Sequence, residues 1–71
     1  MDDKVILTSS ADEIFVRLLQ NNLERAEIPS WTLNKKDSSY MTFGDIEIYV
    51  NADQLDDAKQ ILEATSLEED N

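Results

Sequence analysis

The alternation of apolar and polar residues in the segment DIEIYV, residues 45–50, is the sequence feature that most limits the folds available to this chain. Ile46, Ile48 and Val50 fall on one face of an extended strand, while Glu47 and Tyr49 fall on the other. A strand with one apolar face is stable only when a second layer covers that face. The sequence therefore predicts a sheet with helices packed against it.

Two segments have the periodicity of amphipathic helices that could form this second layer. From Ala11 to about Ala26, apolar residues recur within one broad arc at 100° per residue, and the following Ile28-Pro29 step ends the helix. The arc holds Ala11, Ile14, Phe15, Val16, Leu18, Leu19, Leu23 and Ala26. A closing helix carries a stripe that fades before residues 66–71, formed by Leu55, Ala58, Ile61, Leu62 and Thr65.

Two further strands, Lys4–Thr8 and Ser30–Asn34, complete the order β-α-β-β-α. We expect the first and third strands to form a parallel pair through the first helix, with both helices on one face of the sheet. The predicted fold is an α+β two-layer α/β sandwich with strand order 1-3-2, ferredoxin-like but lacking the last strand. With 71 residues the chain makes a single domain, residues 1–66, followed by an acidic tail, residues 67–71.

Clustered acidic residues precede both helices. Ser10 and Glu13 have the spacing of a capping box, as do Asn51 and Gln54, and the neighbouring aspartates fall in first turns, where the helix dipole favours negative charge. A calcium loop would need a central glycine and a distal bidentate glutamate, which NADQLDDA lacks. We therefore predict helix starts here and no metal site.

The charge balance limits the partners of the chain. Six basic and sixteen acidic residues give a net charge of -10, which repels nucleic acid and anionic lipid. Cysteine and histidine are both absent, so we expect neither catalytic residues nor a cofactor. The N-terminus has no apolar run approaching the roughly 20 residues of a membrane span, so we expect a cytoplasmic protein.

Two stretches carry a family resemblance: VILTSSADEIFVRLLQNNLERAEIP and DIEIYVNADQLDDAKQILE. They resemble a small prokaryotic family of unknown function labelled "putative signal-transducing protein", whose helices end in Leu-x-x-Ala-Gly-Ile-Pro and Ala-x-x-Ile-Leu patterns. The matching positions are all structural: Leu23, Ala26, Ile28, Pro29, Ile48, Val50, Asp53, Ala58, Ile61 and Leu62. The resemblance implies a fold related to PII-like nitrogen regulators. Glu27 stands where the family commonly has glycine, which argues against a left-handed helix end.

An exposed strand edge is the first candidate for a functional surface. The first strand contains Val5, Ile6 and Leu7, with no proline or internal charge to discourage pairing with another chain. We expect homodimerisation through this edge, or its cover by the tail. Trp31 and Tyr49 add an aromatic patch to the interface if they lie on the sheet face away from the helices, although Trp31 could equally point inward because its strand is too short to fix the register.

The segment between the second and third strands is the second candidate. It holds Lys35 and Lys36 beside Ser38, Ser39 and Tyr40, which could bind a small anionic ligand. Two lysines without a glycine-rich backbone cradle are weak evidence for such a site, and the sequence favours a solvated hairpin loop. Asn22, within the apolar arc of the first helix, is explained by a hydrogen-bonded, half-buried amide.

These features favour a non-catalytic protein-interaction or regulatory module over an enzyme. The alternative is a sensor of a small anionic ligand that uses the Lys35/Lys36 segment. We expect the partner to be another protein or a second copy of the chain, and neither nucleic acid nor a membrane.

Overall fold

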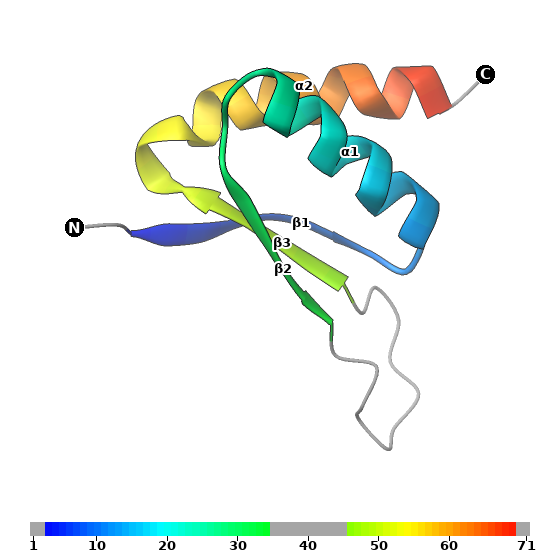
Figure 1. The fold of residues 1–71 in the computed structure, drawn as a ribbon, viewed down its shortest axis with the longest axis horizontal. Coiled ribbons are helices and arrows are strands. Elements are labelled where there is room, and N and C mark those ends of the chain that lie inside the picture. Colours follow the sequence, from blue (N-terminus) through cyan, green and yellow to red (C-terminus); the bar gives the residue numbers. More distant parts are fainter. Residues whose placement is uncertain (1–2, 35–45, 70–71) are drawn as a thin grey trace.

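The computed structural model describes residues 3–34 and 46–69, which form a three-stranded sheet covered by two helices (Figure 1). The elements are β1 (Lys4–Ser10), α1 (Glu13–Arg25), β2 (Ser30–Asn34), β3 (Ile46–Asn51), the short 3-10 helix η1 (Ala52–Gln54) and α2 (Leu55–Glu69). Both helices lie on the same face of a sheet whose strand order is β1-β3-β2. The α+β sandwich and its strand order are therefore confirmed.

The expected parallel pair of β1 and β3 is wrong, because both β1 and β2 pair with β3 in the antiparallel sense. β1 and β2 consequently run in the same direction, with β3 inserted between them. The helical crossover through α1 thus joins β1 to β2, which are not neighbours in the sheet, and β3 fills the gap.

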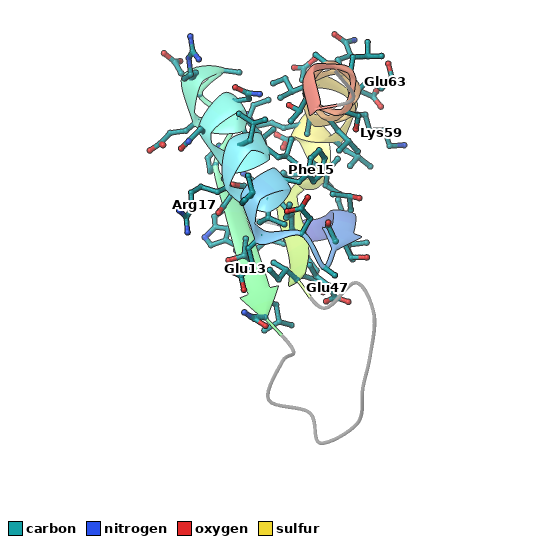
Figure 2. The ribbon with its side chains drawn as sticks, turned by 90° about the vertical axis from the view of Figure 1, so that its right-hand side faces the viewer. Glu13, Phe15, Arg17, Glu47, Lys59 and Glu63 are labelled. Carbon is teal, nitrogen blue, oxygen red and sulfur yellow. The ribbon has the colours of Figure 1, made fainter. Side chains whose placement is uncertain are left out.

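The core lies between β3 and the helix layer. Ile46, Ile48 and Val50 are buried on β3, whereas the residues between them are only half-buried. In Figure 2, Phe15 points into the space between α1 and α2, while Arg17 and Lys59 point away from it. The remaining core residues are Val16, Leu19, Leu23, Ile28 and Ala58. The predicted apolar arc of α1 was too broad, because Ile14 is 78% exposed.

A β-bulge interrupts β1. Ile6 pairs with Tyr49 and Thr8 pairs with Ile48, so Leu7 is an extra residue with no partner of its own on β3. Leu7 and Thr8 are both half-buried, while Ile6 and Ser9 are exposed. The bulge therefore shifts the alternation of β1 by one residue.

The predicted capping box at Ser10 is wrong, because the N-cap of α1 lies two residues after Ser10. The helix N-cap is Asp12, whose Oδ1 accepts hydrogen bonds from the backbone N-H groups of Ile14 at 3.0 Å and Phe15 at 3.3 Å. Ser10 is the last residue of β1, and its hydroxyl accepts from the N-H of Asp12 at 3.0 Å. Ser10 thus supports the cap residue instead of capping the helix.

The second predicted capping box also fails. Asn51 is the N-cap of η1, but its side chain makes no capping hydrogen bond to the backbone, and its amide nitrogen donates instead to Oε1 of Gln54 at 3.4 Å. Asp53 lies in the first turn of η1, and Asp56 and Asp57 lie in the first turn of α2, as the helix-dipole argument predicts.

The two helices are joined by a buried hydrogen bond. The Asn22 amide on α1 donates to Oγ1 of Thr65 on α2 at 2.8 Å, and the Thr65 hydroxyl in turn donates to the carbonyl of Ile61 at 2.8 Å. Thr65 is fully buried, and the half-buried amide expected for Asn22 is confirmed. α2 continues past Thr65 to Glu69, beyond the point where its stripe fades.

α1 ends in a left-handed residue despite the absence of glycine. Glu27 has φ = 63°, and the N-H groups of Glu27 and Ile28 donate to the carbonyls of Glu24 and Leu23, both at 2.9 Å. These two bonds define a Schellman motif, and its hydrophobic contact falls between Leu23 and Ile28 in the core. The expectation that glutamate would prevent this helix end is therefore wrong. The burial of Leu23 and Ile28 explains why the strained conformation persists.

This strain predicts that Glu27→Gly stabilises the protein. A left-handed conformation costs an L-residue roughly 1–2 kcal/mol, and the extra freedom of glycine in the unfolded chain offsets part of that gain. We expect the free energy of unfolding to rise by about 0.5–1 kcal/mol, measured by urea denaturation. Glu27→Ala is the control, because it removes the charge but keeps Cβ. Equal stabilisation by both variants would show that charge, and not backbone strain, is responsible.

Candidate protein-interaction surface

The face of the sheet turned away from the helices, here called the open face, carries an apolar cluster. One row of paired residues crosses all three strands, from Ile6 through Tyr49 to Trp31, and Leu33 lies opposite Glu47 in the next row. Ile6, Trp31 and Leu33 are 47%, 39% and 48% exposed. The structure thus settles the orientation of Trp31, which faces away from the core.

The apolar side chains of β2 point away from the helix layer. Trp31 and Leu33 lie on the open face. Ser30, Thr32 and Asn34 lie on the helix side of the sheet, where they pair with the buried residues of β3. In a sheet with one face packed on helices and the other in water, apolar residues normally point toward the helices. The large apolar side chains of β2 are therefore available for another surface.

A lysine from the opposite edge lies over the Trp31 ring. The Nζ atom of Lys4 on β1 is 4.4 Å from the centroid of the Trp31 ring on β2, so this cation-π contact spans the central strand. On β3, the hydroxyl of Tyr49 donates to Oε1 of Glu47 at 2.8 Å, which orients the ring along the strand. The aromatic cluster is thus held in place by contacts on both sides.

Within residues 3–34 and 46–69, the strands carry few charges although the chain is strongly acidic. Of the charged residues that the structure describes, Lys4 and Glu47 are those on the strands, one of each sign. The acidic residues of the helices, including Asp56, Asp57 and Glu63, belong to the opposite layer. Charge repulsion therefore opposes association least at the open face.

The residues predicted for the interface do not form one surface. Ile6, Trp31 and Tyr49 lie together on the open face, whereas Val5 and Leu7 are half-buried and pack against the core on the helix side. Sequence reasoning missed Lys4 and Leu33. The alternation of Trp31 and Leu33 in SWTLN was a usable signal for Leu33. No pattern in the sequence indicated the contact of Lys4 with the Trp31 ring. The interface role of the predicted residues remains a prediction.

The predicted ligand-binding residues Lys35, Lys36, Ser38, Ser39 and Tyr40 lie outside the described residues. Among the described side chains, those of residues 3–34 and 46–67, no three acidic groups converge as a cation site would require. The same part of the chain contains no helix with the length and apolar character to cross a membrane.

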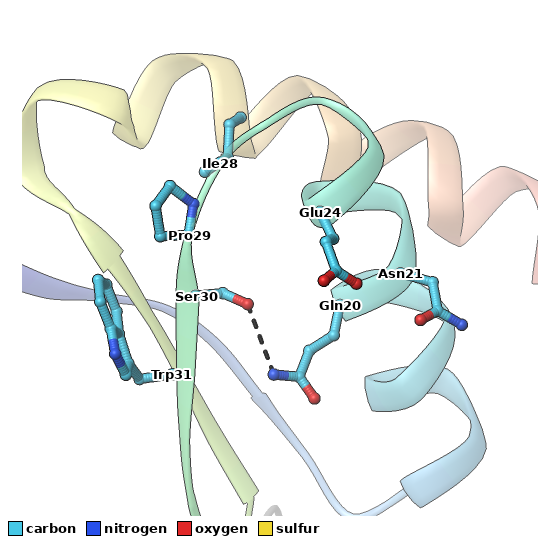
Figure 3. A pocket seen from close by; sticks show the side chains of 7 residues that line it. All are labelled: Gln20, Asn21, Glu24, Ile28, Pro29, Ser30 and Trp31. Carbon is cyan, nitrogen blue, oxygen red and sulfur yellow. Dashed lines mark hydrogen bonds between the residues drawn. The ribbon is translucent and has the colours of Figure 1, made fainter.

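A hollow of about 350 Å³ lies between α1 and the start of β2 (Figure 3). Gln20, Asn21 and Glu24 line it from α1, and the amide of Gln20 donates to Oγ of Ser30 at 3.5 Å. Figure 3 shows the Trp31 ring on the other side of β2, away from Gln20. Glu24 is the one carboxylate in this lining, so the hollow offers hydrogen bonds but not the paired titratable groups of acid-base catalysis.

The two faces of the sheet should differ sharply in their contribution to stability. We expect Leu33→Thr on the open face to change the free energy of unfolding by less than about 1 kcal/mol, since Leu33 is half exposed and threonine suits a strand. Ile48→Thr should cost about 2–4 kcal/mol, because it buries a hydroxyl in the core and removes apolar volume. Urea denaturation of the two variants gives the comparison. Equal losses would place Leu33 in the core.

Comparison with known families confirms the sequence resemblance. The family model described as "putative prokaryotic signal transducing protein" matches residues 4–66, which include every strand and most of α2. Comparison with the curated proteins and with the solved structures finds no match. Since the family match covers most of the 71 residues, the chain belongs to the family of "putative prokaryotic signal transducing protein".

Proposed function

We propose that this protein is a non-catalytic signalling module that binds a partner protein through its open face. The observation that carries the proposal is the exposed cluster of Ile6, Trp31 and Leu33 on a rigid sheet whose other face is filled by the core. Such a cluster costs solubility unless a partner covers it.

The composition of the open face is typical of a protein-binding surface. Aromatic residues are enriched in the centres of interfaces, and tryptophan and tyrosine contribute disproportionately to binding energy. Trp31 and Tyr49 occupy neighbouring positions in one row, with Ile6 beside them. Because β3 and its neighbours hold these side chains on regular strands, little entropy is lost when a partner binds.

Charge favours another protein over nucleic acid. With a net charge of -10, the chain repels phosphate, whereas Lys4 and Glu47 leave the open face itself neutral. The complementary partner is a protein with an apolar patch surrounded by basic residues, which the acidic helix layer would attract over a distance. The family description as a signal transducing protein agrees with such a role.

The proposal includes no chemical step. The sequence lacks histidine and cysteine, and Glu24 is the one carboxylate in the hollow between α1 and β2. The alternative of a small anionic-ligand sensor depends on Lys35 and Lys36, outside the described residues, and no observation favours it. We propose that the module acts in the cytoplasm, as its acidic, cysteine-free composition is typical of cytoplasmic proteins.

A pair of double variants tests the proposal. Trp31→Thr with Leu33→Thr removes the open-face cluster, whereas Ile14→Gln with Leu67→Gln removes two helix residues that are more exposed, at 78% and 73%. Partners captured by the wild-type protein are purified and titrated against each variant by calorimetry. We expect the first pair to weaken binding about thirtyfold or more and the second to leave affinity within about twofold.

The single tryptophan supplies an independent readout. Trp31 is the one tryptophan in the sequence and is 39% exposed, so its emission should shift to the blue when a partner covers the open face. A partner that binds both double variants with equal affinity, or that leaves the Trp31 emission unchanged, would contradict the proposed surface.

A further inference from the structure

We propose that two copies of the chain pair antiparallel through the outer edges of β2 and form a continuous six-stranded sheet. This contact uses the edge of β2, whereas the partner proposed above uses the open face. The two contacts share Trp31 and Leu33, but only the edge contact depends on Thr32, so variants of Thr32 distinguish failure of this inference from failure of the partner proposal.

β2 is a better edge for pairing than β1. Both are outer strands, but β1 is interrupted by the bulge at Leu7, and such bulges disrupt regular pairing and protect edges. β2 is in unbroken register with β3 over all five of its residues, and Trp31, Thr32, Leu33 and Asn34 are exposed. β2 thus offers a regular edge to another strand.

The charge pattern removes the main obstacle to self-association. Two copies with a net charge of -10 repel each other, so a contact between them must avoid charged residues. β2 has the sequence SWTLN and is the strand without a charged residue, whereas β1 contains Lys4 and β3 contains Glu47. Natural edge strands commonly use charge to prevent pairing, and β2 lacks this protection.

The sequence of β2 is self-complementary in one register. In a continuous sheet, residues directly opposite each other point to the same face, so a twofold axis must pair open-face residues with open-face residues. The register that pairs all five residues places Thr32 opposite its own copy. Trp31 then lies opposite Leu33 of the second copy, and Ser30 lies opposite its Asn34. Apolar residues meet apolar residues on one face, and polar residues meet polar residues on the other.

The helix layer leaves room beside this edge. A hollow of about 200 Å³ lies between α1 and β2, and Arg17, Gln20, Thr32 and Asn34 are among its lining residues. Ser30 is contacted by Gln20 at 3.5 Å, and Thr32, on the same side of the strand, is exposed. The side chain of Thr32 can therefore meet its own copy on the twofold axis without displacing α1.

A five-residue strand pair makes a small interface, so the dimer should be weak. Contacts that bury less than about 1,200 Å² are generally transient, and we expect a dissociation constant between about 10 µM and 1 mM. Salt screens the repulsion between the two acidic copies, so dimerisation should become stronger as the salt concentration rises.

Charged substitutions at Thr32 test the proposed register directly. Thr32→Lys and Thr32→Glu each place like charges opposite each other on the twofold axis, and each should raise the dissociation constant about fivefold or more, measured by sedimentation equilibrium. An equimolar mixture of the two variants should form a heterodimer at least as stable as the wild-type dimer. Thermal unfolding of each variant verifies the fold, which should persist because Thr32 is exposed.

A matched pair of variants identifies the edge. Leu33→Ser on β2 and Ile6→Ser on β1 remove side chains with similar exposure, 48% and 47%, from the same face of the sheet. Pairing through β2 predicts that Leu33→Ser weakens the dimer more than Ile6→Ser does. The proposal is overturned if the wild-type protein remains monomeric up to about 1 mM. It is also overturned if Ile6→Ser has the larger effect or if the mixed Thr32 variants do not associate.

Discussion

Ile48 and Val50 on the central strand are wholly buried beneath α1 and α2, and the rest of the structure depends on this contact. β1 and β2 both pair with β3 and not with each other, so the position of β3 determines where both edges lie. Two helices cover only one face of a three-stranded sheet. Among residues 3–34 and 46–69, no second layer covers the side chains that alternate with Ile48 and Val50 on the opposite face.

The same constraint explains how an acidic chain can present an apolar surface. Packing of the helix layer places Asp56, Asp57 and other acidic residues on the side away from the open face. The open face retains Trp31 and Leu33 with one charge of each sign around them. Pairing of two β2 edges would bring two such faces side by side, and a partner protein would then meet a larger apolar surface.

Local sequence patterns predicted the parts of the fold that depend on local physics. The alternation around Ile48 fixed the buried face of β3, and the stripe from Leu55 to Thr65 fixed the packed side of α2. The relative direction of β1 and β3 was predicted wrongly as parallel, because it depends on which strand receives the crossover from α1. The bulge at Leu7 was not predicted either, because no residue of VIL indicates one.

Two errors at the ends of α1 have a common physical origin. Ser10 has the spacing of a cap, but pairing of β1 with β3 holds it in the strand, so Asp12 caps the helix instead. Glu27 disfavours a left-handed conformation, but burial of Leu23 and Ile28 enforces it. In both places tertiary packing outweighed a local preference of about 1 kcal/mol. The candidate surface was predicted only in part for the same reason, since the orientation of Trp31 depends on register with β3.

The most direct test of this account measures the accessibility of methyl groups in solution by NMR, using a soluble paramagnetic gadolinium chelate and a dilute protein sample. The account predicts strong broadening of the methyl signals of Ile6 and Leu33, and little change for Ile48 and Val50, which the helices cover. Equal broadening of all four residues, or protection of Leu33 with exposure of Ile48, would contradict the assignment of the two faces of the sheet.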